Sequence, residues 1–116
     1  MPAAPAPLDA ETALRAIAHP RRRRMLDLVW DAERTSGELA EGCGLSKPAA
    51  SQHLKVLREA GLVEVRSRGN RRLYRARAER LAELRAFLDL FWAERLAALG
   101  AAVTDRPGSP EPEARR

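Results

Sequence analysis

The chain has 116 residues, which is enough for one modest hydrophobic core and too few for two independent ones. Hydrophobic residues make up 45% and charged residues 32%, as in soluble globular proteins, and no apolar run approaches the roughly 20 residues that span a bilayer. Residues 1–11 lack the basic and apolar segments of a secretion signal, and the single cysteine cannot form an intrachain disulfide. We therefore expect a cytoplasmic protein without a membrane segment.

The charge is unevenly distributed along the chain. Lys and Arg number 21 against 16 Asp and Glu, a net charge of +5. The segment 62–77 alone holds six arginines and one acid, Glu64, so its surplus equals the net charge of the whole chain. A concentrated basic surplus indicates an anionic partner.

Composition and periodicity predict one domain between two tails. Residues 1–7 alternate alanine and proline, and residues 103–116 combine proline, glycine and charge, so both segments are predicted to be disordered. Between them, over 8–102, apolar residues recur at helical spacing and alternate only across 62–76. The expected fold is mainly α with a small β-hairpin.

The first two helices are expected over 8–18 and from Pro20 to about Ala32. The inner face of the second helix is predicted to contain Met25, Leu26, Val29 and Trp30. Its first turn contains four arginines, Arg21 to Arg24, which oppose the helix dipole. We expect one or two of them to reach phosphate and the others to pair with acids.

Two further helices follow in close succession. Thr35 and Glu38 form a T-x-x-E capping box at the start of a helix over 36–42, and glycines 42 and 44 end it. Ser46 caps a second helix over 46–60, whose apolar arc contains Ala50, Leu54, Val56 and Leu57. His53 lies within the apolar arc and is predicted to be a packed histidine. The opposite arc is polar and basic and consists of Lys47, Pro48, Ser51, Gln52, Lys55, Arg58 and Glu59.

A β-hairpin is predicted around the turn dipeptide Gly69-Asn70. Counting outward from this turn pairs Val65 with Tyr74, Val63 with Ala76 and Glu64 with Arg75. Arg68 and Arg71 then lie at the tip.

The last helix is expected over 78–102. Its apolar stripe is too wide for so small a domain to cover, so we predict that it mediates homodimerisation. The candidate interface residues are Leu81, Leu84, Leu88, Phe91, Trp92 and Leu99.

Two helices joined by a glycine-containing turn and followed by a basic hairpin predict a winged helix-turn-helix. The helix over 46–60 fits a DNA major groove, where Lys47 favours guanine acceptors and Gln52 favours adenine. The candidate DNA-binding residues on this helix are Ser46, Lys47, Pro48, Ser51, Gln52 and Lys55. The candidate wing residues are Arg66, Arg68, Asn70, Arg71 and Arg72.

The chain resembles the ArsR family of bacterial winged-helix repressors over AIAHPRRRRMLDLV and TSGELAEGCGLSKPAASQHLKVLREAGLVEVRSRGNRRLYR. The segment LSKPAASQHLKVLREAGLV is the most specific part, and LRAFLDLFWAERLAALG is similar to the C-terminal helix of one subgroup. The resemblance implies a homodimer paired through its first and last helices that binds an inverted-repeat operator in double-stranded DNA. It also implies base contacts from Lys47, Pro48, Ser51 and Gln52, and a wing over 66–72.

The chain departs from the family's metal sensors, which use a Cys-x-Cys motif on the short helix or Asp, His and Glu ligands on the last helix. Here the short helix ends in a lone Cys43 and the last helix has no histidine, so we expect no metal site and no cofactor. No catalytic constellation can be assembled, so an enzyme is not expected. Two alternatives stay open: a metalloid- or redox-responsive repressor using Cys43, and a winged-helix module that binds an acidic protein.

Overall fold

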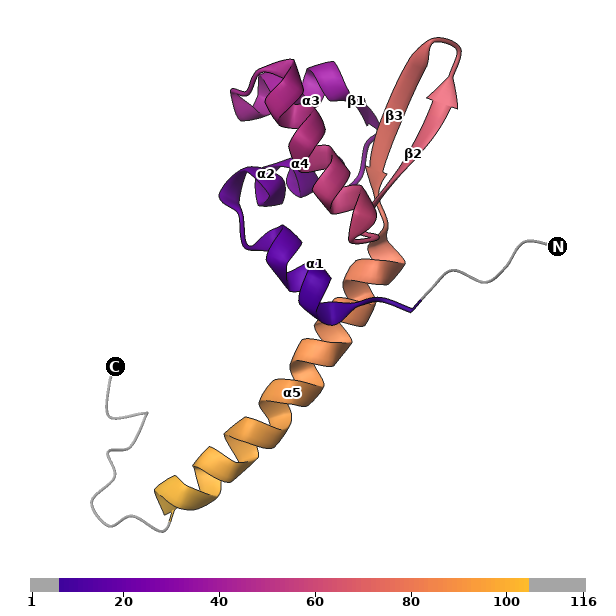
Figure 1. The fold of residues 1–116 in the computed structure, drawn as a ribbon. Coiled ribbons are helices and arrows are strands. Elements are labelled where there is room, and N and C mark those ends of the chain that lie inside the picture. Colours follow the sequence, from indigo (N-terminus) through magenta and orange to yellow (C-terminus); the bar gives the residue numbers. More distant parts are fainter. Residues whose placement is uncertain (1–6, 105–116) are drawn as a thin grey trace, which may run out of the picture. The chain divides into compact units, whose positions relative to one another are not determined.

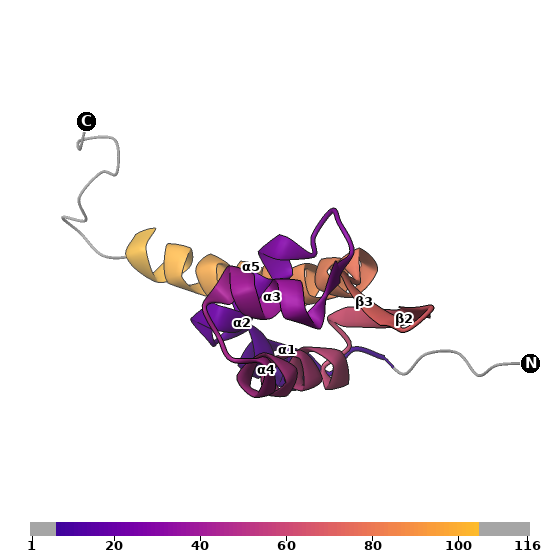
Figure 2. The same cartoon turned by 90° about the horizontal axis from the view of Figure 1, so that it is seen from above.

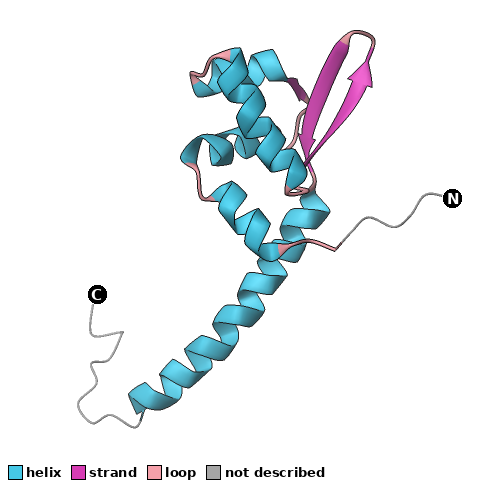
Figure 3. Ribbon diagram, viewed as in Figure 1, coloured by secondary structure: helices cyan, strands magenta, loops and turns pink. Residues whose placement is uncertain are grey.

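The computed structural model describes residues 7–104, so the predictions for the two tails lie almost wholly outside the described residues. The chain divides into two compact units, with the boundary between Leu84 and Arg85. Figure 1 and Figure 3 show the helices and strands of the first unit and the long helix that contains the boundary.

Helices α1 (Ala10–Ile17) and α2 (Pro20–Leu28) open the first unit. The side chain of Asp9 caps α1 by accepting hydrogen bonds from the backbone N–H groups of Glu11 and Thr12 at 3.2 and 3.4 Å. His19 caps α2 in the same manner, because its Nδ1 accepts from the N–H of Arg21 at 3.1 Å. Helix α1 begins two residues after the predicted start.

The prediction for the end of α2 was wrong. The helix stops at Leu28, four residues before Ala32, and the carbonyl of Val29 instead accepts a hydrogen bond from the N–H of Ala76 at 3.0 Å. Val29 is buried, but Trp30, which was expected on the inner face, is 53% exposed. The chain leaves the helix at Val29 to meet a distant strand. Trp30 therefore lies beyond the helix, and helical spacing does not predict which way it faces.

The helix-turn-helix consists of α3 (Ser36–Cys43) and α4 (Lys47–Glu59). The predicted capping box at the start of α3 is confirmed, since the side chains of Thr35 and Glu38 each bind the other residue's backbone N–H. Gly44 ends α3 with φ of +65°, a left-handed conformation that glycine adopts without strain. Three residues, 44–46, therefore separate the two helices.

A three-stranded antiparallel sheet completes the first unit, with β1 (Arg34–Thr35), β2 (Val63–Arg68) and β3 (Arg71–Ala76) in the order β1-β3-β2. The predicted hairpin register is confirmed at all three pairs, and Arg68 lies opposite Arg71 at the tip. Strand β1 was not predicted, because two residues show no periodicity and only their pairing with Leu73 and Tyr74 makes them a strand.

The core of the first unit lies between the helices and the base of the hairpin. Figure 2 shows α3 and α4 side by side, with the hairpin extending beyond the helices. The largest fully buried side chains come from α2 and the residue after it, from α3 and α4, and from the start of the hairpin, namely Met25, Val29, Leu39, Leu54, Leu57, Leu62 and Val63. On α4, Leu54 and Leu57 are buried as predicted, whereas Val56, placed on the same arc, is 36% exposed.

Helix α5 (Ala78–Thr104) is longer than predicted by two residues. Leu84 was expected to meet a partner subunit, but it is only 3% exposed in the single chain, so its side chain has almost no surface left for one. Beyond the unit boundary Leu88 is half-buried, and six other large apolar side chains are exposed, by 36% to 64%: Phe87, Leu90, Phe91, Trp92, Leu96 and Leu99. The rings of Phe91 and Trp92 meet edge to face, with centroids 5.3 Å apart.

Candidate nucleic-acid interface

The outer face of α4 presents all six of its candidate DNA-binding residues to solvent: Ser46, Lys47, Pro48, Ser51, Gln52 and Lys55. Ser46 also caps the helix, because its Oγ accepts from the N–H of Ala49 at 3.2 Å. Pro48 occupies the first turn, where a missing N–H costs no helical hydrogen bond. The N-terminal end of α4 thus combines a positive dipole end with the Lys47 ammonium, and the two together favour an anion.

The position of α4 is fixed by the face opposite to this one. Ala50, Leu54 and Leu57 are buried, and the helix packs on α1, α2, α3 and β2. The turn before α4 is held as well, because Arg21 donates from Nη1 to the carbonyl oxygen of Cys43 at 2.8 Å. The polar face therefore belongs to a helix with little freedom to rotate.

The arginine run at the start of α2 binds carbonyl groups rather than acids, contrary to our expectation. Arg22 Nε donates to the carbonyl oxygen of Ala16 at 2.6 Å, and Arg23 Nη1 donates to that of Ile17 at 2.7 Å. These carbonyls belong to the C-terminal end of α1, which carries the negative end of a helix dipole. The structure thereby explains how α2 tolerates cations in its first turn. Arg24 is exposed and makes no hydrogen bond or ion pair with a described residue.

The wing carries its arginines in three different environments. Arg68 and Arg71, at the tip, are exposed and make no hydrogen bond or ion pair within residues 7–104. Arg72 places its guanidinium carbon 6.0 Å from the centre of the Tyr74 ring. Arg66 forms a two-pronged ion pair with Glu33, in which Nε binds Oε2 and Nη2 binds Oε1, the latter at 2.7 Å.

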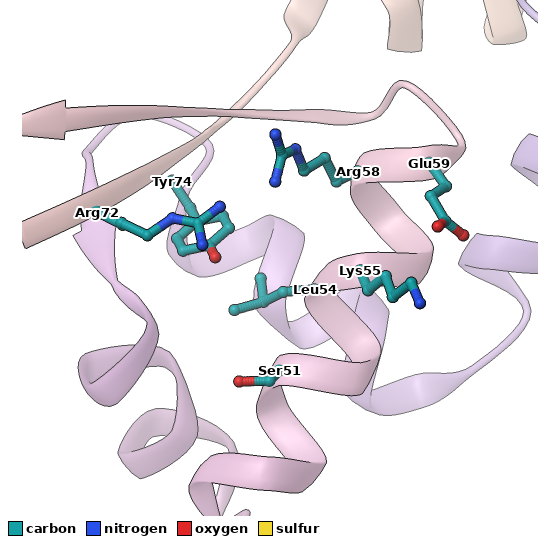
Figure 4. A pocket seen from close by; sticks show the side chains of 7 residues that line it. All are labelled: Ser51, Leu54, Lys55, Arg58, Glu59, Arg72 and Tyr74. Atoms are coloured by element: carbon teal, nitrogen blue, oxygen red, sulfur yellow. The ribbon is translucent and has the colours of Figure 1, made fainter.

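A groove of about 490 Å³ separates the outer face of α4 from the hairpin. Leu54 and the Tyr74 ring contribute apolar surface, and the charged side chains are three cations and one acid, Glu59. Figure 4 shows Arg58 reaching from α4 toward the hairpin, where Arg72 lies across Tyr74. The complete lining is Ser51, Leu54, Lys55, Arg58, Glu59, Arg72 and Tyr74.

Sequence reasoning placed Arg58 on the polar arc but did not select it as a DNA-binding residue. The only available signal was its helical position, seven residues after Ser51 and therefore almost in line with it. The groove between α4 and β3 is what distinguishes Arg58 from an ordinary solvated arginine, because that groove requires the hairpin to fold back beside the helix.

His53 is a packed histidine, as predicted. It is half-buried, its Nδ1 lies 3.2 Å from Nη1 of Arg22, and its ring centre lies 4.5 Å from that of His19. Burial is the main cause that lowers the pKa of His53, and the neighbouring His19 and Arg22 lower it further. Its contacts with Arg22 and His19, and its absence from the groove lining, give it a packing role.

Cys43 is half-buried at the end of α3, with its Sγ 3.9 Å from the carbonyl oxygen of Arg21. Burial raises the pKa of this thiol, although Arg24 and Arg21 oppose the effect. Within residues 7–104, no group of three or more His, Cys, Asp and Glu side chains is arranged to hold a metal ion. The described helices also include none that is long and apolar enough to cross a membrane.

Comparisons with known proteins agree with this geometry. A family described as a helix-turn-helix domain matches residues 17–66. The HTH-type transcriptional regulator Rv2034 of Mycobacterium tuberculosis is 42% identical over 86 residues, 74% of this chain and 80% of that protein. The probable mercury resistance operon repressor of Streptomyces lividans is 36% identical over 97 residues, 84% of this chain and 77% of that protein. Against the regulator Rv0324 of Mycobacterium tuberculosis, 38% identical, the chain spans only 43% of the relative's length.

Solved structures show the same fold. A possible transcriptional regulator for arsenical resistance is 44% identical, with a TM-score of 0.66 over 78% of this chain and 95% of that one. The homodimeric winged helix-turn-helix DNA-binding domain of Mb0332 from Mycobacterium bovis, a possible ArsR-family regulator, is 35% identical, with a TM-score of 0.59 over 74% and 80% of the two chains. With its helix-turn-helix, its arginine wing and these relatives, the chain belongs to the ArsR family of winged helix-turn-helix transcriptional regulators.

Proposed function

We propose that this regulator is a cytoplasmic, homodimeric repressor that binds an inverted-repeat operator in double-stranded DNA. The observation that carries the proposal is the arrangement around one groove. The exposed polar face of α4 forms one side, the arginine wing forms the other, and the charged lining between them is mainly cationic. A DNA backbone requires positive charge between the base-reading helix and the wing.

In this proposal α4 enters the major groove and its first two turns meet the base edges. Gln52 forms the paired hydrogen bonds that an adenine offers, and Lys47 donates to guanine acceptors. Arg58 and Arg72 bind the phosphate backbone that crosses the groove, and Arg68 and Arg71 extend the contact from the wing tip. The helix supplies sequence discrimination, and the arginines supply affinity that depends on salt.

The homodimer is supported by the exposed apolar side chains of α5 beyond residue 84 and by the homodimeric state of the Mb0332 domain. Exposed aromatic and leucine side chains at helical spacing are unfavourable in water and favour pairing with a second copy. A two-fold dimer places its two recognition helices about one DNA turn, roughly 34 Å, apart, which predicts an inverted repeat.

The proposal includes no metal or redox signal through Cys43. A half-buried thiol with a raised pKa is a poorer nucleophile and metal ligand than an exposed thiolate. We expect Cys43→Ser to leave operator binding unchanged in the presence of arsenite, zinc or peroxide. Loss of signal-dependent release in this variant would instead support the metalloid- or redox-responsive repressor.

The deciding experiment is selection from a random double-stranded DNA library with the purified protein at roughly physiological salt, which suppresses non-specific electrostatic binding. Enrichment of an inverted repeat is the expected result and tests sequence recognition and two-fold symmetry together. Failure to enrich any motif, with binding that only follows the salt concentration, would contradict the proposal and favour the protein-interaction module.

A further inference from the structure

The outer half of the wing has little packing of its own. Every residue from Arg66 to Arg72 is exposed, and the buried side chains of the hairpin, Val63, Tyr74 and Ala76, lie nearer its base. An exposed two-stranded hairpin is at best marginally stable in water, and the repulsion among its arginines destabilises it further. Some other contact must fix the direction in which this half of the wing points.

The ion pair between Glu33 and Arg66 lies where such a contact is needed. Arg66 is the first exposed arginine of β2 and pairs with Leu73 of β3, and Leu73 also pairs with Thr35 of β1. Glu33 directly precedes β1, so its bond to Arg66 crosses the central strand of the sheet and joins the two edges. It therefore connects the wing to the loop that leads into β1.

The geometry of this pair is that of a strong and specific interaction. Both donors, Nε and Nη2 of Arg66, bind the two oxygens of one carboxylate, and this planar fork is available to arginine but not to lysine. The Glu33 side chain is 24% exposed while Arg66 is bound to it, so removal of Arg66 would leave this carboxylate without its ion-pair partner. Glu33 also repels any phosphate that approaches Arg66.

We propose that Glu33 and Arg66 form a clamp that holds the wing in its DNA-binding direction, and that Arg66 is a positioning residue rather than a phosphate contact. This inference rests on the proposed DNA-binding function. It replaces the direct role that the sequence predicted for Arg66, and it assigns to Glu33, an acid, a positive contribution to the binding of a polyanion.

The direction in which one substitution changes the affinity for DNA distinguishes the clamp from simple electrostatics. Glu33→Gln removes a negative charge near the DNA, so electrostatics alone predicts tighter binding. The clamp predicts the opposite, a loss of about threefold to tenfold in affinity for the selected operator, because the wing must then be ordered during binding. Glu64→Gln is the matched control, since Glu64 is an exposed acid of β2 outside the clamp, with its carboxylate 3.8 Å from Nε of Arg77. It makes the same change in charge and should not weaken binding.

Arg66→Lys tests the fork itself. The variant keeps the positive charge, so a phosphate contact would largely survive. The clamp instead predicts the same loss of operator affinity as in Glu33→Gln. Combining the two substitutions should then cause no further loss. In both Glu33→Gln and Arg66→Lys, the slope of the logarithm of affinity against the logarithm of salt concentration should stay at the wild-type value. Arg71→Ala should reduce the magnitude of this slope by about one per wing. An increase in affinity for Glu33→Gln, or full activity of Arg66→Lys, would overturn the clamp.

A measurement without DNA separates failure of the clamp from failure of the proposed function. Nitrogen relaxation on the free protein should give backbone order parameters near 0.85 at residues 67–71 in the wild type and below about 0.6 in Glu33→Gln. Thermal unfolding of both proteins checks that the remaining fold is intact. If these order parameters do not change, the clamp is wrong whatever the affinities show. If they fall but no duplex binds the wild type, the clamp holds and the proposed function fails.

Discussion

Helix α4 and the part of α5 beyond the unit boundary differ in the kind of side chain that each leaves exposed. On α4, Leu54 and Leu57 are buried within the first unit and the polar side chains are exposed. On α5 from residue 85, six large apolar side chains are exposed, including Phe91 and Trp92 at 36% and 53%. The apolar side chains of α4 are largely buried by other parts of the same chain, whereas most of those on α5 beyond residue 84 are not.

This difference separates two kinds of interaction surface. The exposed face of α4 is polar and stable in water, so it can remain free until it meets the base edges of DNA. The exposed face of α5 is apolar, so water favours its burial against another protein surface. The comparison predicts that substitutions on the exposed face of α5 change the oligomeric state, whereas substitutions on the exposed face of α4 change which DNA sequence is preferred.

The largest expected effect comes from Phe91→Glu. A charge in the middle of the exposed stripe should convert the dimer to a monomer in sedimentation equilibrium and reduce operator affinity by about 100-fold or more, because the two half-sites are then bound independently. Ala93→Glu, on the opposite face of the same helix, is the control and should stay dimeric. A dimeric Phe91→Glu protein would show that the exposed stripe is not the interface.

Gln52→Ala tests whether α4 recognises bases. We expect preference to be lost at one position in each half-site, with about tenfold weaker binding to the selected operator and little change on scrambled DNA. Competition among operators altered at single base pairs measures this preference. Equal loss on cognate and scrambled duplexes would mean that Gln52 contacts only the backbone.

Arg71→Ala should produce a smaller effect of a different kind. Arg71 lies at the wing tip without a partner among the described residues, so its loss should weaken all sequences severalfold and alike. Titrations across a series of salt concentrations should show a lower slope than for Gln52→Ala. A sequence-dependent loss would indicate that the wing tip reads bases in the minor groove.

The smallest expected effect is a pH dependence of stability from His53. Because burial lowers the pKa of His53 below 6.5, the unfolded chain binds this proton more tightly than the folded one does. The free energy of unfolding should therefore be highest above pH 6.5 and decrease as the pH falls through this value. Chemical denaturation at pH 7.5 and 5.5 measures the change, and His53→Gln should reduce it. A wild-type protein more stable at pH 5.5 would contradict this sign.

Local chemistry in the sequence determined the helix-turn-helix and the hairpin. The capping box at Thr35, the cap at Ser46 and the turn at Gly69 each act over a few residues, so their sequence neighbours were sufficient to predict them. The exposed positions of Lys47 and Gln52 followed from helical spacing alone.

The tertiary structure decided every feature that depends on residues far apart in the sequence. The early end of α2 depends on Ala76, strand β1 exists only because β3 lies beside it, and the arginines of α2 bind the end of another helix. The sequence likewise gave Arg66 the same expected role as Arg71, because spacing shows charge but not partners. Only the folded chain brings Glu33 to Arg66, across 33 positions of sequence, and this long-range pairing is what distinguishes the two arginines.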